Sequence, residues 1–261
     1  MDVSGAADRP FRRHALAAAA AVQHQRGHTA VPAHDALQLF RRRRLCAVLD
    51  AVNNHDAVRT NADCAAATLA AECGAIAICA DLSVSSEAKR AVEDARVALG
   101  GIDVLVNNAG ISQIKMLCDV TDDDWQRMIN TNLSSAFFVS QSVLPDMVSQ
   151  KCGRIINIGS MWGKTGASCE VHYSASKAAL RGFTMALAKE VGPSGITVNA
   201  IEPGVIKTDM NASLSFEDKA AICEETPLMR MGEPEEIAKA GAEIVAVSSA
   251  GDANAKGIAR A

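Results

Sequence analysis

The stretch that decides the fold is residues 102–110, which have the sequence IDVLVNNAG. Residues 102–106 are mostly apolar, as expected for a strand that is covered on both faces. An amide-rich turn follows directly. Strand-like and helix-like segments alternate on both sides of this stretch, and that alternation predicts an α/β fold with a doubly wound parallel sheet of the Rossmann-like type.

The apolar and helical patterns give bounds for the elements. We expect strands at residues 74–80, 102–106, 155–158 and 196–201, and helices at 85–99, 121–147, 171–191 and from 233 onward. In such sheets, ligands bind beyond the carboxyl ends of the strands. Asn108, Ser160 and the pair Pro203 and Gly204 all follow strands, so we expect them to meet at one edge of the sheet.

The only tyrosine, Tyr173, begins the run YSASK, so that Lys177 stands four residues after it. In a helix this spacing places both side chains on one face. A nearby cation favours the phenolate and draws the tyrosine pKa down from about 10. A phenol, an ammonium and the hydroxyl of Ser160 are the groups needed to move a proton onto a carbonyl oxygen. The alternative is a packed tyrosine beside a surface lysine.

Four motifs around this run carry a resemblance to a known family: NNAG at 107–110, NTNLSS at 130–135, RIINIGS at 154–160 and ITVNAIEPGVIKT at 196–208. Together they resemble the short-chain dehydrogenase/reductase family over about residues 62–240. Among its branches the chain is most similar to the 3-oxoacyl-[acyl-carrier-protein] reductases. Residues 160–171 also resemble a reductase that acts on a 5-aminopentanone modification of an elongation factor.

The resemblance implies four catalytic residues. Tyr173 would protonate a substrate carbonyl while a nicotinamide delivers hydride, and Lys177 would lower the tyrosine pKa and bind the nicotinamide ribose. Ser160 would donate to the carbonyl oxygen. Asn132 would hold a water that links Lys177 to solvent. The implied reaction is NAD(P)H-dependent reduction of a ketone to a secondary alcohol, with a 3-oxoacyl thioester as the expected substrate.

NADPH is the cofactor that the resemblance implies, with NADH as the alternative. Besides Tyr173 and Lys177, the implied cofactor contacts are Asp81 and Leu82 near the adenine, Asn108, Ala109 and Gly110 along the cofactor, and Pro203, Gly204, Ile206 and Thr208 around the carboxamide. The same resemblance implies a role in fatty acid biosynthesis, a cytoplasmic location and a homo-oligomer, either a tetramer or a dimer.

Several of these residues have a simpler interpretation. Asn132 could be a helix-interior amide bonded to backbone, and Ser160 could only cap the end of a strand. We expect His172 on the surface, because consecutive helix residues point apart. Trp162 is expected to form a wall of the substrate pocket. Glu202 replaces the small residue usual in the family, so it either disfavours acidic substrates or faces solvent.

Composition excludes several classes of protein. A chain of 261 residues with 49% apolar residues suits one α/β domain with a sizeable core. The net charge of −4 gives no reason to expect nucleic-acid binding, and no apolar run reaches the roughly 20 residues of a membrane span. The eight cysteines form neither a Cys-x-x-Cys pair nor zinc-ligand spacing. We therefore expect free, buried thiols in a reducing compartment and no metal site.

The N-terminal segment departs from the family. A glycine-rich phosphate loop is expected near residues 31–40, yet no glycine lies between Gly27 and Gly74. We therefore divide the chain into an atypical Arg- and Ala-rich segment at 1–45 and a Rossmann-like domain at 46–261. The segment could be a transit peptide, a basic arm for an anionic partner, or a genuine variant. The hypothesis we prefer is a stretch translated in the wrong reading frame.

These departures leave a second class of function open. Without a phosphate loop, the chain could be a non-enzymatic or inactive relative that keeps only the catalytic half. The C-terminus departs as well, because residues 245–257 show no convincing last strand. In the family that tail often supports subunit contacts, so the sequence does not decide between tetramer and dimer.

Overall fold

The computed structural model of the chain describes residues 15–21, 29–30, 45–51, 76–211 and 214–249. Its main feature is a six-stranded sheet with the strand order β4-β3-β1-β5-β7-β8, in which every neighbouring pair is parallel. The strands are β1 (Ala15–Ala21), β3 (Leu45–Ala51), β4 (Ile76–Ala80), β5 (Val104–Asn107), β7 (Gly153–Ile158) and β8 (Ile196–Ile201). This order is that of a doubly wound dinucleotide-binding sheet, which confirms the predicted fold class.

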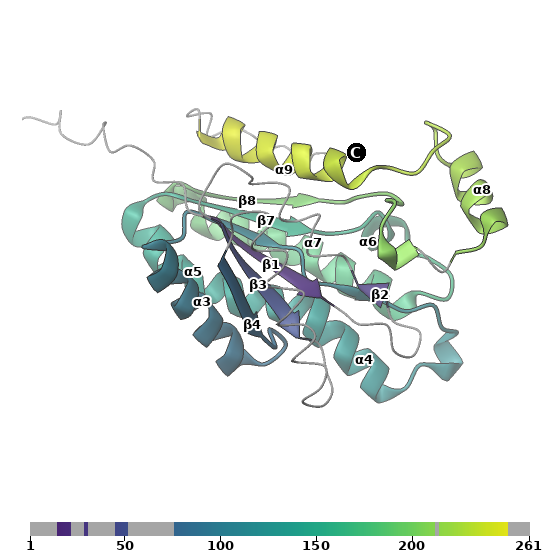
Figure 1. The fold of residues 1–261 in the computed structure, drawn as a ribbon, viewed down its shortest axis with the longest axis horizontal. Helices are drawn as coiled ribbons and strands as arrows, with labels where there is room; N and C mark the ends of the chain where they lie inside the picture. The colour runs from purple at the N-terminus through teal and green to yellow at the C-terminus, as the bar shows by residue number, and fades with distance from the viewer. Residues whose placement is uncertain (1–14, 22–28, 31–44, 52–75, 212–213, 250–261) are drawn as a thin grey trace, which may run out of the picture.

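Helices cover both faces of this sheet (Figure 1). The described helices are α3 (Ser85–Leu99), α4 (Asp122–Ile129), α5 (Ser135–Gln150), α6 (Trp162–Thr165), α7 (Val171–Val191), α8 (Phe216–Glu225) and α9 (Pro234–Ser249). Helix α9 lies along β8 and β7 on one face, whereas α3, α5 and α7 pack on the other. A short antiparallel pair, β2 (Thr29–Ala30) with β6 (Ile111–Ser112), stands beside the main sheet.

The expected strands and helices from residue 74 onward are confirmed, with small shifts at their ends. Helix α4 begins with a capping box, in which the Thr121 hydroxyl accepts from Asp124 N and the Asp124 carboxylate accepts from Thr121 N. The expected long helix then continues through a π turn, η2 (Asn130–Ser134), into α5. At the start of α3, Val84 occupies the N-cap position and makes no side-chain capping bond.

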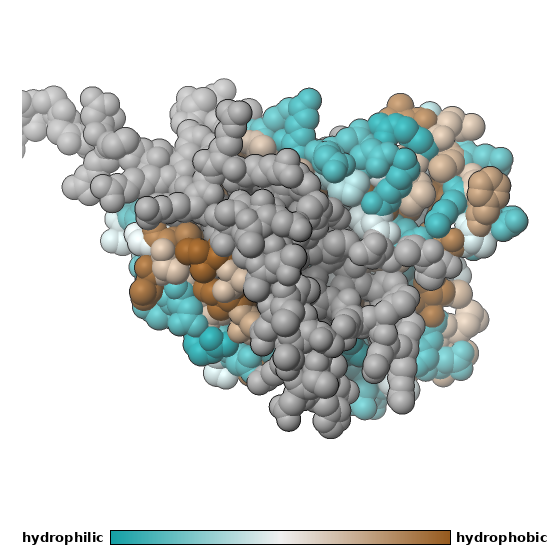
Figure 2. Space-filling model, viewed as in Figure 1, coloured by the Kyte–Doolittle hydropathy of each residue, from teal (hydrophilic) through white to brown (hydrophobic). Residues whose placement is uncertain are grey.

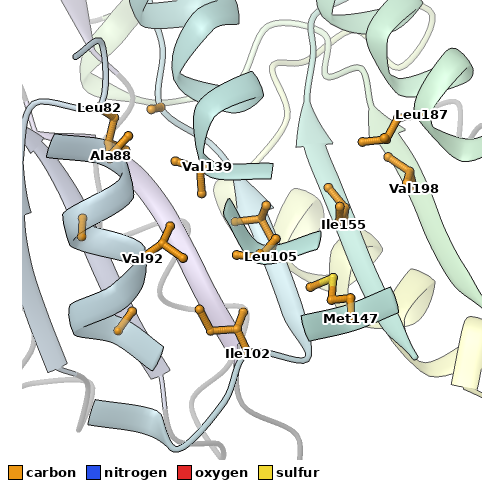
Figure 3. Packing of buried hydrophobic residues seen from close by; sticks show 14 of the residues in the cluster. Leu82, Ala88, Val92, Ile102, Leu105, Val139, Met147, Ile155, Leu187 and Val198 are labelled. Atoms are coloured by element: carbon orange, nitrogen blue, oxygen red, sulfur yellow. The ribbon is translucent and has the colours of Figure 1, made fainter. Parts of the chain in front are cut away.

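The main core lies between the sheet and the helices α3, α5 and α7 (Figure 3). Apolar side chains from the strands meet apolar side chains from all three helices there, including Leu105, Ile155, Val198, Val92, Val139 and Leu187. Small residues on α3, such as Ala88 and Ala91, are fully buried and bring that helix close to the sheet. Burial of this apolar layer holds the helices on the sheet, and so it sets the positions of the strand ends where the site lies.

The N-terminal strands were not predicted from the sequence. Strand β1 occupies the centre of the sheet and pairs Ala18 with Asn107 of β5, although it belongs to the segment that we set apart as atypical. Residues 31–44, where the phosphate loop was expected and where the four arginines stand, lie outside the described residues. At the other end, helix α9 continues to Ser249, and the tail from residue 250 also lies outside the described residues.

The cysteines differ in part from the expectation. Cys118, Cys152, Cys169 and Cys223 are free thiols, but Cys118 is exposed and the other three are half-buried, so the expected burial is wrong for them. Of the helices in the described part of the chain, none is long and apolar enough to cross a membrane.

Candidate active site

The site lies at the carboxyl ends of β5, β7 and β8, as the motif positions predicted. The segments after β7 and β8 stay bonded to each other beyond the strands, because Gly159 N donates to Ile201 O at 2.7 Å and Met161 N donates to Pro203 O at 2.9 Å. These two bonds hold Ser160 and Pro203 at the same edge of the sheet. Helix α7 runs past this edge and carries Tyr173 and Lys177.

A cavity of about 100 Å³ opens at this edge. It brings together the predicted residues Asn108, Ser160, Tyr173, Lys177, Pro203, Gly204, Ile206 and Thr208. It is also lined by residues that sequence reasoning missed, namely Ile158, Gly159, Met210, Asn211, Pro234 and Ile237. Ile158 and Gly159 directly precede Ser160, so their position in the strand was a usable signal. Nothing in the sequence pattern of α9 pointed to Pro234 or Ile237.

Tyr173 and Lys177 are both buried, on the same face of α7. The ammonium Nζ of Lys177 lies 5.8 Å from the centre of the Tyr173 ring and donates to Ile158 O at 2.9 Å. Burial lowers the pKa of Lys177 to about 8, because a charged amine loses its water there. The amine is therefore fixed between the end of β7 and the phenol.

The pKa of Tyr173 differs from the expected direction. Burial raises the pKa of Tyr173 to about 12, a hydrogen bond with the Ser160 side chain opposes this rise, and the charge of Glu170 adds to it. The expectation that Lys177 lowers this pKa is wrong for the structure, because desolvation outweighs the attraction of an amine that bonds to Ile158 O instead. The phenol consequently keeps its proton at neutral pH.

Ser160 has two partners. Its hydroxyl accepts a hydrogen bond from Trp162 N at 3.2 Å, and its side chain lies close enough to the Tyr173 phenol to oppose the rise of the phenol's pKa. The first contact matches the simpler interpretation, a residue that caps the end of β7. The second places the hydroxyl at the phenol, in the wall of the cavity. Ser160 therefore combines a local structural contact with a position suited to a carbonyl oxygen.

Asn132 is buried in the π turn between α4 and α5, away from the cavity lining. Its Oδ1 accepts from Ile111 N at 2.8 Å, and its Nδ2 donates to Ile111 O at 2.9 Å and to Ser176 Oγ at 3.0 Å. This is the helix-interior amide bonded to backbone that the sequence left open. Because Ile111 packs against Tyr173, the amide fixes the surroundings of the phenol. The proposed water relay through Asn132 stays a prediction.

Gly110 lies between Asn132 and the lysine. A Cβ atom built on Gly110 would stand 3.2 Å from Lys177 Nζ and 3.5 Å from Asn132 Oδ1. A side chain at residue 110 would therefore crowd the amine, which places the NNAG turn against Lys177. Ala109 is buried beside it.

Asp81 and Leu82 are not brought to this cavity. Asp81 follows β4, and its carboxylate accepts from Ser83 N at 3.0 Å. The side chain of Leu82 is fully buried in the core beside α3. Their predicted place near the adenine stays a prediction.

His172 is fully buried, so its expected surface position is wrong. Its Nε2 lies 2.9 Å from Gln113 Oε1, and Gln113 Nε2 donates to Asp124 Oδ1 at 3.1 Å. Since the Gln113 amide presents its oxygen to the ring, Nε2 must carry the proton. Burial lowers the pKa of His172, and the Asp124 charge opposes this. The segment after β6 packs over the first turn of α7 and covers a side chain that helix geometry alone would leave outside.

Trp162 packs against Tyr173 and Ile111. It stands on α6, which approaches α7 so closely that a Cβ atom on Gly163 would lie 2.8 Å from the Lys177 carbonyl carbon. Trp162 does not line the cavity itself. It supports the cavity wall by packing against Tyr173, which does line the cavity.

The cavity fits the nicotinamide end of a dinucleotide. The Nδ2 atom of Asn108 is buried in the cavity wall and has no hydrogen-bond partner in the described part of the chain. A buried donor without a partner is costly, and a polar ligand group would satisfy it. Lys177 and Asn108 offer donors to a sugar or an amide, while Pro203, Gly204 and Ile206 offer an apolar surface to a ring.

Comparison with known proteins places the chain in a family. The model of the family described as short chain dehydrogenase matches residues 43–219, and the chain belongs to this family.

Individual relatives are 3-oxoacyl-[acyl-carrier-protein] reductases. The one from Salmonella typhimurium is 46% identical over 149 residues, which are 57% of this chain and 61% of the relative. The one from Aquifex aeolicus is 46% identical over 149 residues, or 57% and 60% of the two chains. The one from Pseudomonas aeruginosa is 44% identical over 159 residues, or 61% and 64%. The chain thus spans about three fifths of the length of these relatives.

Proposed function

We propose that the protein is an NAD(P)H-dependent reductase that converts a ketone into a secondary alcohol. The observation that carries this proposal is that the Tyr173 phenol and Ser160 line the same cavity, with the buried amine of Lys177 beside the phenol ring. A phenol with a raised pKa holds its proton until a stronger base appears. The oxygen of a carbonyl that is being reduced becomes such a base.

Each residue has a separate task in this reaction. Tyr173 donates its proton to the carbonyl oxygen, and Ser160 stabilises the negative charge that grows there. A bound reduced nicotinamide supplies the hydride for the carbonyl carbon. Lys177 and Asn108 would hold the sugar and the amide of that cofactor, and Lys177 would stabilise the phenolate that remains. Proton donation of this kind contributes about 10²–10⁴-fold to the rate.

A 3-oxoacyl thioester is the substrate class that we propose first. The relatives are named as reductases of 3-oxoacyl groups on an acyl carrier protein. NADPH is the cofactor that we propose, as the sequence resemblance implies. The segment that lines the cavity at Met210 and Asn211 leads toward α8, where Figure 2 shows apolar atoms at the surface. Phe216, Leu228 and Met229 are exposed there. These side chains suit an acyl chain or its carrier.

A second candidate substrate is an amino ketone of the 5-aminopentanone type. Glu170 favours it, because this half-buried carboxylate is close enough to Tyr173 for its charge to raise the phenol pKa. A cation on the substrate would offset that charge and the cost of burying the carboxylate. Comparing kcat/KM for acetoacetyl thioester with kcat/KM for an amino ketone of similar length distinguishes the two candidates.

The test of the proposed function begins with nucleotide binding. We expect NADPH to stabilise the protein by about 2.7 kcal/mol at 100 times its dissociation constant, measured as a shift of the unfolding temperature. Tyr173→Phe should then lower turnover of acetoacetyl thioester at least about 100-fold while leaving the NADPH dissociation constant unchanged. A variant that keeps full turnover would contradict the role of the phenol.

The non-enzymatic alternative rests on the missing glycine loop between Gly27 and Gly74. It predicts that neither NADPH nor NADH shifts the unfolding temperature at millimolar concentration. The encoding DNA offers an independent check of the reading-frame hypothesis, since another frame over the first 60 or so codons should contain the glycine-rich fingerprint. Absence of that fingerprint from both other frames contradicts a frame error.

We also propose that the protein acts as a homo-oligomer. Exposed apolar side chains lie on the helices of one face, namely Trp125 on α4, Phe137 and Val148 on α5, and Met185 on α7. Contact between two copies would cover them. Light scattering after gel filtration measures the mass, and a monomer at micromolar concentration contradicts this proposal. A cytoplasmic location stays a prediction.

A further inference from the structure

Glu202 lies next to two residues of the cavity lining, Gly159 and Pro203. Its side chain is mostly buried and forms an ion pair. It lies between the last residue of β8 and Pro203, and its side chain is 12% exposed. The side chain crosses Gly159 so closely that a Cβ atom there would be 3.1 Å from Glu202 Cγ. Of the two alternatives that the sequence left for Glu202, a side chain facing solvent is therefore wrong.

The partner of Glu202 is Arg181 on helix α7. Arg181 Nε lies 3.3 Å from Glu202 Oε1 as an ion pair without a hydrogen bond from Nε, and the two side chains are 28% and 12% exposed. Arg181 follows Lys177 by four residues and Tyr173 by eight, so the three side chains occupy one face of the helix. Along this face Lys177 is bonded to the end of β7, and Arg181 is paired at the end of β8.

The ion pair has an electrostatic consequence for the cavity. Pro203 and Gly159, the neighbours of Glu202 in sequence and in space, both line the cavity. A carboxylate at this place would repel the phosphates of a dinucleotide if it were not neutralised. Because both side chains are largely removed from water, the charge of Glu202 is screened mainly by its partner rather than by solvent.

We propose that Arg181 is a binding determinant for the cofactor: it holds the Glu202 carboxylate against α7 and neutralises it, so that the cavity accepts an anionic dinucleotide. This inference rests on the proposed function. It assigns a role to two residues that contact neither substrate nor reacting atoms. It also predicts an asymmetry, because removing the cation leaves a bare carboxylate beside the cavity, whereas removing the carboxylate does not.

The experiment measures the NADPH dissociation constant of four proteins: the full chain, Arg181→Met, Glu202→Gln and the double variant. We expect Arg181→Met to weaken NADPH binding about tenfold, equivalent to about 1.4 kcal/mol. Glu202→Gln should stay within about twofold of the unchanged protein, and so should the double variant, since neither leaves an unpaired carboxylate.

A matched control is Arg90→Met, which removes an arginine from an exposed ion pair with Asp94 on α3. It should leave NADPH affinity unchanged. Equal losses in Arg181→Met, Glu202→Gln and the double variant would overturn the proposal in favour of a purely structural pair. Unchanged affinity in Arg181→Met overturns it while the proposed function stands. If the unchanged protein binds neither NADPH nor NADH, both the function and this inference fail.

Discussion

The ammonium of Lys177 lies 5.8 Å from the centre of the Tyr173 ring but donates its hydrogen bond to the Ile158 carbonyl. The two groups are close enough to interact electrostatically, but the pKa of each is set mainly by its own burial. Burial lowers the pKa of Lys177 to about 8 and raises the pKa of Tyr173 to about 12. Both pKa shifts favour the uncharged forms, the neutral amine of Lys177 and the neutral phenol of Tyr173. The first two predictions follow from these shifts.

Lys177 should make stability depend on alkaline pH. Its pKa is about 8 in the folded chain and 10.5 when unperturbed, so the unfolded state binds more protons between these values and the free energy of unfolding rises with pH. We expect a rise of about 1–3 kcal/mol between pH 7.5 and pH 10 that Lys177→Met lacks, measured by urea unfolding. Lys189→Met, on an exposed part of the same helix, should keep the rise. An identical pH profile in Lys177→Met would show that the amine is hydrated.

Tyr173 should make the two directions of the reaction respond differently to pH. Reduction needs the phenol, which is protonated far below its pKa of about 12, so kcat/KM for the ketone should be level across neutral pH. Oxidation of the alcohol needs the phenolate, so its kcat/KM should rise about tenfold per pH unit. Initial rates in both directions from pH 6 to pH 9 provide the measurement. A plateau of the oxidation rate below pH 8 would mean that the phenol is more acidic during turnover.

His172 should weaken the fold in acid. Burial lowers its pKa below 6.5 in the folded chain, so below that pH the unfolded state gains a proton that the folded state resists, and stability is lost as the pH falls. Glutamine can also donate to Gln113 but does not titrate. We therefore expect His172→Gln to lose less unfolding free energy than the unchanged protein between pH 7 and pH 5. Equal losses in urea unfolding would contradict a neutral, buried imidazole.

Asn132 should matter for stability as well as for turnover. Asn132→Ala leaves the backbone N–H and C=O of Ile111 without their partners, which costs about 2–4 kcal/mol of unfolding free energy for two buried groups. Asn130→Ala is the matched control in the same turn, because the Asn130 side chain accepts hydrogen bonds from the side chains of Gln126 and Ser134 and contacts no buried backbone group in the structure described. Thermal unfolding should separate the two variants by several degrees. If they unfold together, the amide of Asn132 is not structural.

The sequence predicted those parts of the fold whose signal is local. The apolar run before Asn108 and the helical spacing of Tyr173 and Lys177 were sufficient for β5 and α7. Strand β1 was missed because it consists almost entirely of alanine, which has low strand propensity and no alternating pattern.

The site shows the same division. Motif positions predicted which residues gather at the edge of the sheet, because strand ends are readable in a sequence. The direction of the Tyr173 pKa was not predictable, since desolvation depends on residues that pack from elsewhere. The burial of His172 depends in the same way on Gln113, which lies 59 positions away. The pairing of Arg181 with Glu202 required knowing that α7 passes the end of β8.

The π turn at Asn130–Ser134 contains the bond from Ser135 N to Asn130 O, five residues apart, so this turn holds one residue more than an α turn. Each residue of a helix advances it by about 100°. Deleting one residue here would rotate either Asn132 away from Ile111 or the apolar face of α5 away from the sheet. Insertions and deletions are therefore excluded from this short stretch, and a length change there would be a sign that a related chain has lost the geometry around its tyrosine.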